Sequence, residues 1–216
     1  TGVERGAVTL EGQAVAALTT WTFEPKWIVA ATADSRVVVI RNADLQIAHK
    51  SEPLPAAVTQ LSGELNGSKV AALLADGTIR LLTVAADTGA IAVAAEVKSD
   101  AGPIQKLAGS ATSLLTVAAD KTVQNWNADN ASQINRFDLP GPIAAISVNA
   151  AAERAVFSLA DGQTLLWSTK EAKQIAALNT DLVAQKRLKK SEQMKAVFDS
   201  RVNVVKAQVD EAEKEV

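Results

Sequence analysis

The sequence predicts a mainly β fold in which residues 13–178 form four blades of a β-propeller, an incomplete ring, and residues 179–216 form a long helix of a coiled coil. Three observations predict it. A unit of roughly 40 residues occurs four times, each unit holds four short apolar runs, and the apolar spacing becomes helical after Leu178. With 216 residues, 48% of them hydrophobic, the chain can bury a substantial core.

The second strand-like run of each unit ends at an aspartate that begins a turn. These aspartates are separated by 42, 44 and 41 positions, so the units are in register. They are Asp34, Asp76, Asp120 and Asp161. A glycine follows Asp76 and Asp161, as in tight hairpins that need a positive φ, and an aspartate can hydrogen-bond the turn amides. We therefore expect a structural role for each aspartate in its own turn.

A large apolar residue stands six positions after each aspartate, in the third strand-like run. The four residues, which we expect in the blade cores, are Ile40, Leu82, Trp126 and Trp167. Proline cannot sit in a central strand, so Pro53, Pro103 and Pro140 mark the ends of units. Four strands per unit of about 40 residues is the pattern of propeller blades.

These units resemble WD40 repeats. Residues 143–167, IAAISVNAAAERAVFSLADGQTLLW, match best, because Asp161 and Trp167 stand where the family has its turn aspartate and closing tryptophan. The repeats are degenerate: only Thr32 fills the hydroxyl position of the family's hydrogen-bonded set, and the Gly-His pair is missing. The resemblance implies a protein-binding propeller, and the degenerate set predicts blades held mainly by aliphatic packing.

Residues 1–12 resemble the end of a preceding unit. Residues 8–10 are expected to form an outer strand of a preceding or closing blade. WD40 rings usually have about seven blades, within a range of roughly four to eight. We therefore expect the ring to be completed by further blades of the same polypeptide or of a partner.

The C-terminal segment changes to helical spacing. Its apolar residues alternate four and three positions apart, as in a coiled-coil seam. The partner-binding candidates on this seam are Phe198, Val202, Val205 and Val209. Basic residues gather at 186–190 and acidic residues at 210–215, so an antiparallel helix of similar composition would match both halves. Together with the Ala-rich composition, this order of elements resembles exported WD40 proteins of planctomycete-like bacteria, which implies a periplasmic or cell-envelope location rather than a cytoplasmic one.

No catalytic, cofactor-binding or metal-binding residue is expected within the chain. The absence of cysteine excludes disulfides, thiolate nucleophiles and attachment of a c-type haem here. His49 is the only histidine, which excludes a His-based triad and a multi-histidine site, and we expect it at the surface. The turn aspartates fall one per blade, too far apart to share a metal ion. A net charge of -2 argues against nucleic acid, and no apolar run is long enough for a membrane span.

We predict a non-enzymatic scaffold that binds proteins as part of a larger complex. Trp21 and Trp27, near Phe23, are further candidates for a partner contact, and the alternative for them is packing inside the ring. A second function remains open: the propeller portion of a redox or electron-transfer protein whose cofactor domain, for example a cytochrome c, lies outside this chain. A Cys-x-x-Cys-His motif in that domain would favour the second function.

Overall fold

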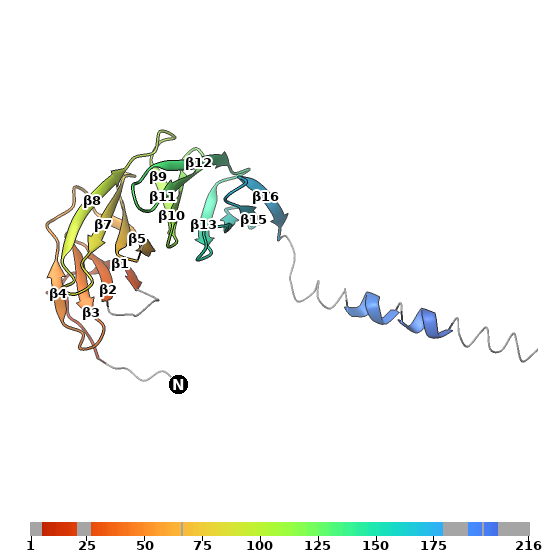
Figure 1. The fold of residues 1–216 in the computed structure, drawn as a ribbon, viewed down its shortest axis with the longest axis horizontal. Helices are drawn as coiled ribbons and strands as arrows, with labels where there is room; N and C mark the ends of the chain where they lie inside the picture. Colours follow the sequence, from red (N-terminus) through yellow and green to blue (C-terminus); the bar gives the residue numbers. More distant parts are fainter. Residues whose placement is uncertain (1–5, 21–26, 66, 179–189, 196, 203–216) are drawn as a thin grey trace, which may run out of the picture. The chain divides into compact units, whose positions relative to one another are not determined.

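The computed structural model describes residues 6–20, 27–65, 67–178, 190–195 and 197–202 (Figure 1). The chain divides into two compact units, Thr1–Ala177 and Leu178–Val216. The described strands form four antiparallel four-stranded sheets, each in chain order. The predicted mainly β fold with four propeller blades is therefore confirmed.

Each sheet is a meander in which consecutive strands pair. The first contains β1 (Val15–Thr20), β2 (Trp27–Thr32), β3 (Val37–Arg41) and β4 (Ile47–Lys50). The second contains β5 (Val58–Leu65), β6 (Lys69–Leu74), β7 (Ile79–Val84) and β8 (Ile91–Val97). The third contains β9 (Ile104–Gly109), β10 (Ser113–Ala118), β11 (Thr122–Asn127) and β12 (Gln133–Asp138). The fourth contains β13 (Ile143–Val148), β14 (Arg154–Leu159), β15 (Thr164–Ser168) and β16 (Lys173–Ala177).

The first strands of the sheets lie along the inner side of an arc (Figure 1). Strand β1 contacts β5, β5 contacts β9, and β9 contacts β13. Every substantial contact between sheets in the described part of the chain joins two neighbours in sequence. The four sheets are therefore blades that follow one another in chain order.

The core lies between neighbouring sheets, because the central strands are apolar on both faces. In the first sheet, Val29, Ala31, Val37 and Val39 are fully buried against the second sheet. Similar clusters lie between the second and third sheets and between the third and fourth. Short aliphatic side chains on alternate strand positions thus bind each blade to the next.

Main-chain and polar side-chain contacts join the inner strands as well. The Gln60 side chain on β5 accepts a hydrogen bond from the Leu107 amide at 3.3 Å and donates to the Leu107 carbonyl at 2.8 Å. The amide of Gly109 donates to Ser62 Oγ at 2.8 Å. A Cβ at Gly109 would lie 2.7 Å from that oxygen, so a larger residue there would displace the Ser62 side chain and its hydrogen bond.

One predicted element differs in the structure, and a second is described only in part. Residues 8–10, expected as an outer strand, pair with no strand of the described chain, since none of the four sheets supplies an inner neighbour for them. The described helix covers residues 190–195 and 197–202 only, so the long coiled-coil helix of residues 179–216 is not shown. The rest of that segment lies outside the described residues. None of the described helical residues forms a segment long and apolar enough to cross a membrane.

Candidate interaction surfaces

The four turn aspartates hold the hairpins between second and third strands. Oδ1 accepts from the main-chain amide two residues later in three of them, at 2.9 Å in Asp76 and Asp120 and 3.0 Å in Asp161. Asp34 differs, because its Oδ1 accepts the Thr32 hydroxyl at 2.5 Å. Each carboxylate therefore accepts a hydrogen bond within its own turn. The described carboxylates and His49 form no group of three or more that could hold a metal ion.

These hydrogen bonds favour the ionised carboxylates. The Thr32 hydroxyl, helped by the nearby Lys50 and Arg36 charges, holds the pKa of Asp34 below its usual range. The hydroxyl and amide of Thr78 lower the pKa of Asp76 in the same way. For Asp120 the main cause of the lowered pKa is the hydrogen bond from the Thr122 amide.

The large apolar residues six positions after the aspartates are all buried. Each packs toward the preceding side of its sheet: Leu82 against the first sheet, Trp126 against the second and Trp167 against the third. The Trp126 indole also donates to Thr116 Oγ1 at 2.9 Å. Ile40, in the first sheet, packs toward the same side, where no described sheet lies.

Leu10 covers that side of the first sheet. It is buried and packs with Val8 against Ala30, Val38 and Ile40. At each of the three contacts between neighbouring sheets, one residue that follows the third strand of the earlier unit packs in the same cluster as the large apolar residue of the later unit. These residues are Leu54 with Leu82, Val97 with Trp126 and Leu139 with Trp167. Leu10 therefore occupies the place of the last buried residue of a preceding blade.

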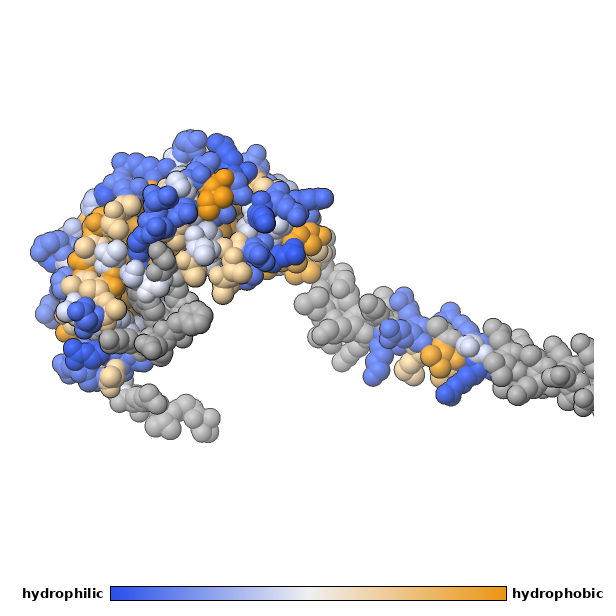
Figure 2. Space-filling view, viewed as in Figure 1, coloured by the Kyte–Doolittle hydropathy of each residue, from blue (hydrophilic) through white to orange (hydrophobic). Residues whose placement is uncertain are grey.

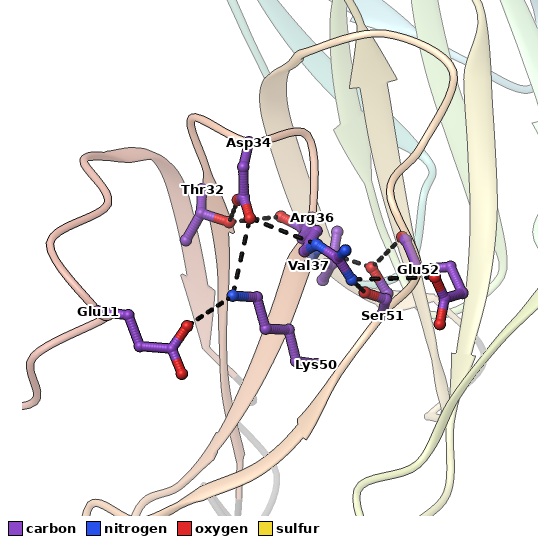
Figure 3. Close-up of polar contacts among 8 residues, drawn as sticks. All are labelled: Glu11, Thr32, Asp34, Arg36, Val37, Lys50, Ser51 and Glu52. Atoms are coloured by element: carbon purple, nitrogen blue, oxygen red, sulfur yellow. Dashed lines mark hydrogen bonds and ion pairs between the residues drawn. The ribbon is translucent and has the colours of Figure 1, made fainter.

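A polar network fixes the N-terminal segment to the first sheet (Figure 3). Lys50 Nζ lies 3.1 Å from Glu11 and 3.7 Å from Asp34. Arg36 lies 3.4 Å from Asp34 and donates to the Ser51 carbonyl at 2.8 Å. Sequence reasoning missed this network, because nothing in the spacing of Glu11 and Lys50 indicates that they meet.

The fourth sheet has one side that faces away from the third sheet. Within the described residues, no other sheet covers this side. Equivalent positions in the first sheet are Val29, Ala31, Val37 and Val39, which the next sheet buries completely. In the fourth sheet they are Val156, Ser158, Thr164 and Leu166, and all four are only half-buried. Ser158 and Thr164 hydroxyls lie 3.4 Å apart, so this surface mixes apolar and hydroxyl groups.

The partner-binding candidates fall into three groups. Phe198 and Val202 lie on the described helix with 61% and 47% of their surface exposed, and Figure 2 shows an apolar patch on this helix. Val205, Val209 and Trp21 lie outside the described residues. Trp27 follows the alternative expectation of packing and is not available as a partner contact: it is 4% exposed, packs between the first two sheets, and its indole N–H donates to the Ala86 carbonyl at 3.2 Å.

His49 lies on β4 and is half-buried rather than at the open surface. Its Nδ1 is buried and has no hydrogen-bond partner in the described part of the chain. It pairs across the sheet with Val39 and is the only histidine of the chain.

Comparison with known proteins bears on the fold alone. No family model matches the sequence, and no curated protein matches it. Among solved structures, the chain is similar to the β-propeller domain of Cps50 (Swd1) from Myceliophteria thermophila, with a TM-score of 0.62 and 15% sequence identity. The match covers 73% of this chain and 51% of that one, so the chain spans about half the length of the solved propeller. With its four consecutive blades, the chain has a β-propeller fold.

Proposed function

We propose that this chain is a non-catalytic scaffold whose blades are joined by further blades into a closed propeller and whose C-terminal helix pairs with a partner helix. Propellers present rigid loops and blade faces to other proteins, and function on such a fold depends on surfaces rather than on the fold itself. Three surfaces support this proposal. They are the side of the first sheet on which Leu10 packs (the seat of Leu10), the free side of the fourth sheet and the apolar stripe of the helix.

The seat of Leu10 carries the proposal. Residues 8–10 pair with no strand of the described chain, and the Leu10 carbonyl accepts only from the nearby Gln13 amide at 2.8 Å. A neighbouring strand would pair the remaining main-chain groups of this segment. Three further strands beside residues 8–10 would complete a four-stranded blade like the other four. Such a blade would pack on Ile28, Ala30, Val38 and Ile40 as the second sheet packs on Val29 and Ala31.

The free side of the fourth sheet provides the other end of the same contact. Val156 and Leu166 correspond to positions that are completely buried in the first and second sheets. An uncovered blade side and an open sheet edge favour association with another chain. In the absence of the completing blades, we expect the chain to associate with copies of itself.

Sedimentation velocity over a range of protein concentrations tests this proposal. The wild-type chain should show concentration-dependent association, and L166D should reduce it, because a carboxylate on the free side of the fourth sheet cannot be desolvated against an apolar partner. I134D is the matched control, since Ile134 is 53% exposed on the outer strand β12 and lies away from the blade contacts. A wild-type chain that remains a compact monomer at every concentration would contradict the proposal.

A further inference from the structure

The outer edge of the second sheet differs from the outer edges of the other three sheets. Within the described residues, the outer strands β4, β8, β12 and β16 each pair with one strand only, so each leaves one edge without main-chain partners (Figure 1). An exposed edge of this kind is a template for pairing with another strand. All four outer strands have a register shift beside the large apolar residue of the third strand, so this irregularity does not distinguish them.

Strand β8 lacks the charges that protect the other outer edges. Its first five residues, IAVAA at positions 91–95, carry no charge, and the strand holds no glycine or proline. The other three outer strands are shorter, and they carry Lys50, Arg136 and Lys173. Charged side chains, lysine above all, are the usual means by which proteins block pairing at an edge. Among the outer strands of the described chain, β8 is therefore the one best suited to accept a neighbour.

The main-chain groups of Ile91 and Val93 point to the open side of β8. The Ala85 amide donates to the Ala90 carbonyl at 2.9 Å, so these two residues form a hydrogen-bonded pair at the start of the ladder between β7 and β8. The register of β8 against β7 is unbroken from Ile91 to Val93. Successive residues of an antiparallel strand turn their amides and carbonyls to opposite sides. Ile91 and Val93 therefore direct theirs away from β7.

The side chains along this edge leave room for another strand. Val93 is 56% exposed, and its neighbours Ala92 and Ala94 are exposed as well. A β-branched side chain that faces another across a pair of strands stabilises the pairing, and alanine adds little bulk beside it. The edge thus combines unpaired main-chain groups with small, uncharged side chains.

The charges at the two ends of β8 distinguish between the two possible orientations of a second β8. Asp87 precedes the strand, and Glu96 and Lys98 stand at its end, where Lys98 Nζ lies 2.6 Å from Glu96. Two parallel copies of β8 would place Asp87 beside Asp87 and Glu96 beside Glu96. An antiparallel pair centred on Val93 instead brings Asp87 of each copy near Lys98 of the other. The charges are therefore complementary in the antiparallel arrangement only.

We propose that the outer edge of β8 pairs antiparallel with the same edge of a second copy of this chain, about a two-fold axis at Val93. The two second sheets then form one continuous sheet across the contact. Both copies use the same surface, so the contact is complete with two chains and does not extend further. It lies on the outer strand of the second blade, and it depends neither on the completing blades nor on the C-terminal helix.

Cross-linking of an introduced thiol tests the proposal, because the chain has no cysteine of its own. V93C places one thiol of each copy at the axis, and I134C is the matched control, since Ile134 is 53% exposed on β12. Both are made in the L166D chain, so that association through the fourth sheet does not contribute. A short bismaleimide should join V93C chains at least about ten-fold faster than I134C chains, because thiols held together in a dimer have a high effective concentration.

A substitution beside the axis separates strand pairing from general thiol reactivity. A92K in the V93C chain brings two like charges together at the axis and should slow cross-linking to the I134C rate, whereas the neutral A92S should leave it unchanged. In the L166D chain, hydrogen exchange at the Ile91 and Val93 amides should become slower as the protein concentration rises, while the Ala92 amide, which faces β7, should not change. Equal cross-linking of V93C and I134C, or equal effects of A92K and A92S, would overturn the proposal.

Discussion

Residues at equivalent positions of the four blades contribute unequally to stability. Trp167 stacks on Phe137 and meets Phe157 edge to face at 6.4 Å, so the contact between the third and fourth sheets has an aromatic centre. Ile40 and Leu82 hold the same position with aliphatic side chains, although the ring of Trp27 belongs to the same cluster as Leu82. Aromatic pairs add to the free energy gained by burial, so this last contact depends most on a single side chain.

Trp167→Ala should therefore lower the free energy of unfolding by about 3–5 kcal/mol, the range for loss of a buried large aromatic residue. His49→Ala should change it little, because His49 Nδ1 makes no hydrogen bond in the described chain. Denaturant melts of the two variants, fitted with a common slope, measure both effects. Equal losses would show that Trp167 does not hold this central position.

The turn aspartates predict a dependence on pH. The pKa of Asp76 lies below its usual range because the hydroxyl and amide of Thr78 donate to it. A carboxyl whose pKa is lower in the folded than in the unfolded chain stabilises the fold above the unfolded pKa, and the contribution disappears as the pH falls through the folded pKa. Thr78→Ala should raise the pKa of Asp76 and remove part of that contribution.

Thermal melts at several pH values, with an NMR titration of the Asp76 carboxyl, measure this effect. Thr78→Ala should melt at a lower temperature than the wild type near pH 7, and the difference should shrink as the pH falls through the lowered pKa of folded Asp76. Thr83→Ala is the control, since the Thr83 hydroxyl donates to the Ala92 carbonyl and not to a carboxylate. A loss in Thr78→Ala that stays constant down to pH 2 would exclude the carboxyl as its cause.

At the scale of the element, each blade is a simple meander, and specific contacts of the inner strands set the spacing between blades. Gln60 bonds both main-chain groups of Leu107, and Thr19 and Ser62 accept from the amides of Gly63 and Gly109. These bonds join residues that are 44 or 47 positions apart in the sequence. The apolar sides hold the blades together, and the inner-strand contacts fix their register.

Gln60→Ala should cost about 1–3 kcal/mol, because it leaves the amide and carbonyl of Leu107 without their partner in a partly buried place. Gln174→Ala, at an exposed position of the outer strand β16, should cost much less. Chemical denaturation measures both. Hydrogen exchange at the Leu107 amide should also become faster in the first variant, and an unchanged exchange rate would mean that the Gln60 bond does not protect it.

At the scale of the whole molecule, the described chain has two terminal blade sides and one apolar stripe on its helix. The first blade side is covered by Leu10, the last carries Val156 and Leu166, and the helix exposes Phe198 and Val202. These surfaces lie in different parts of the chain. Under the proposed function, the two blade sides would meet the completing blades, and the helix stripe would meet a partner helix.

The helix stripe should make its own contribution to association. Phe198→Asp should weaken pairing of the C-terminal helix, because it places a charge in the apolar seam, whereas Ser200→Asp changes an exposed residue on another face of the same helix. Sedimentation of both variants beside L166D separates the helix from the blade surface. Identical association of Phe198→Asp and Ser200→Asp would show that the seam does not pair.

The sequence by itself determined the repeating elements. The strands and turns of each unit depend on local chemistry: apolar residues alternate in the strands, aspartates form the turns, and prolines mark the boundaries. Four blades in chain order could therefore be predicted. The sequence also predicted residues 8–10 as an outer strand of a preceding or closing blade, whereas in the structure Leu10 packs on the first sheet without strand pairing.

Only the tertiary structure decided what depends on distant contacts. Trp27 is buried because the first two sheets meet around it, and the network of Glu11, Lys50 and Asp34 forms because the N-terminal segment lies against the first sheet. Each of these joins residues whose separation in the sequence carries no periodic signal. The repeat determines which side chains face a neighbouring blade, and the fold determines which of those contacts are filled.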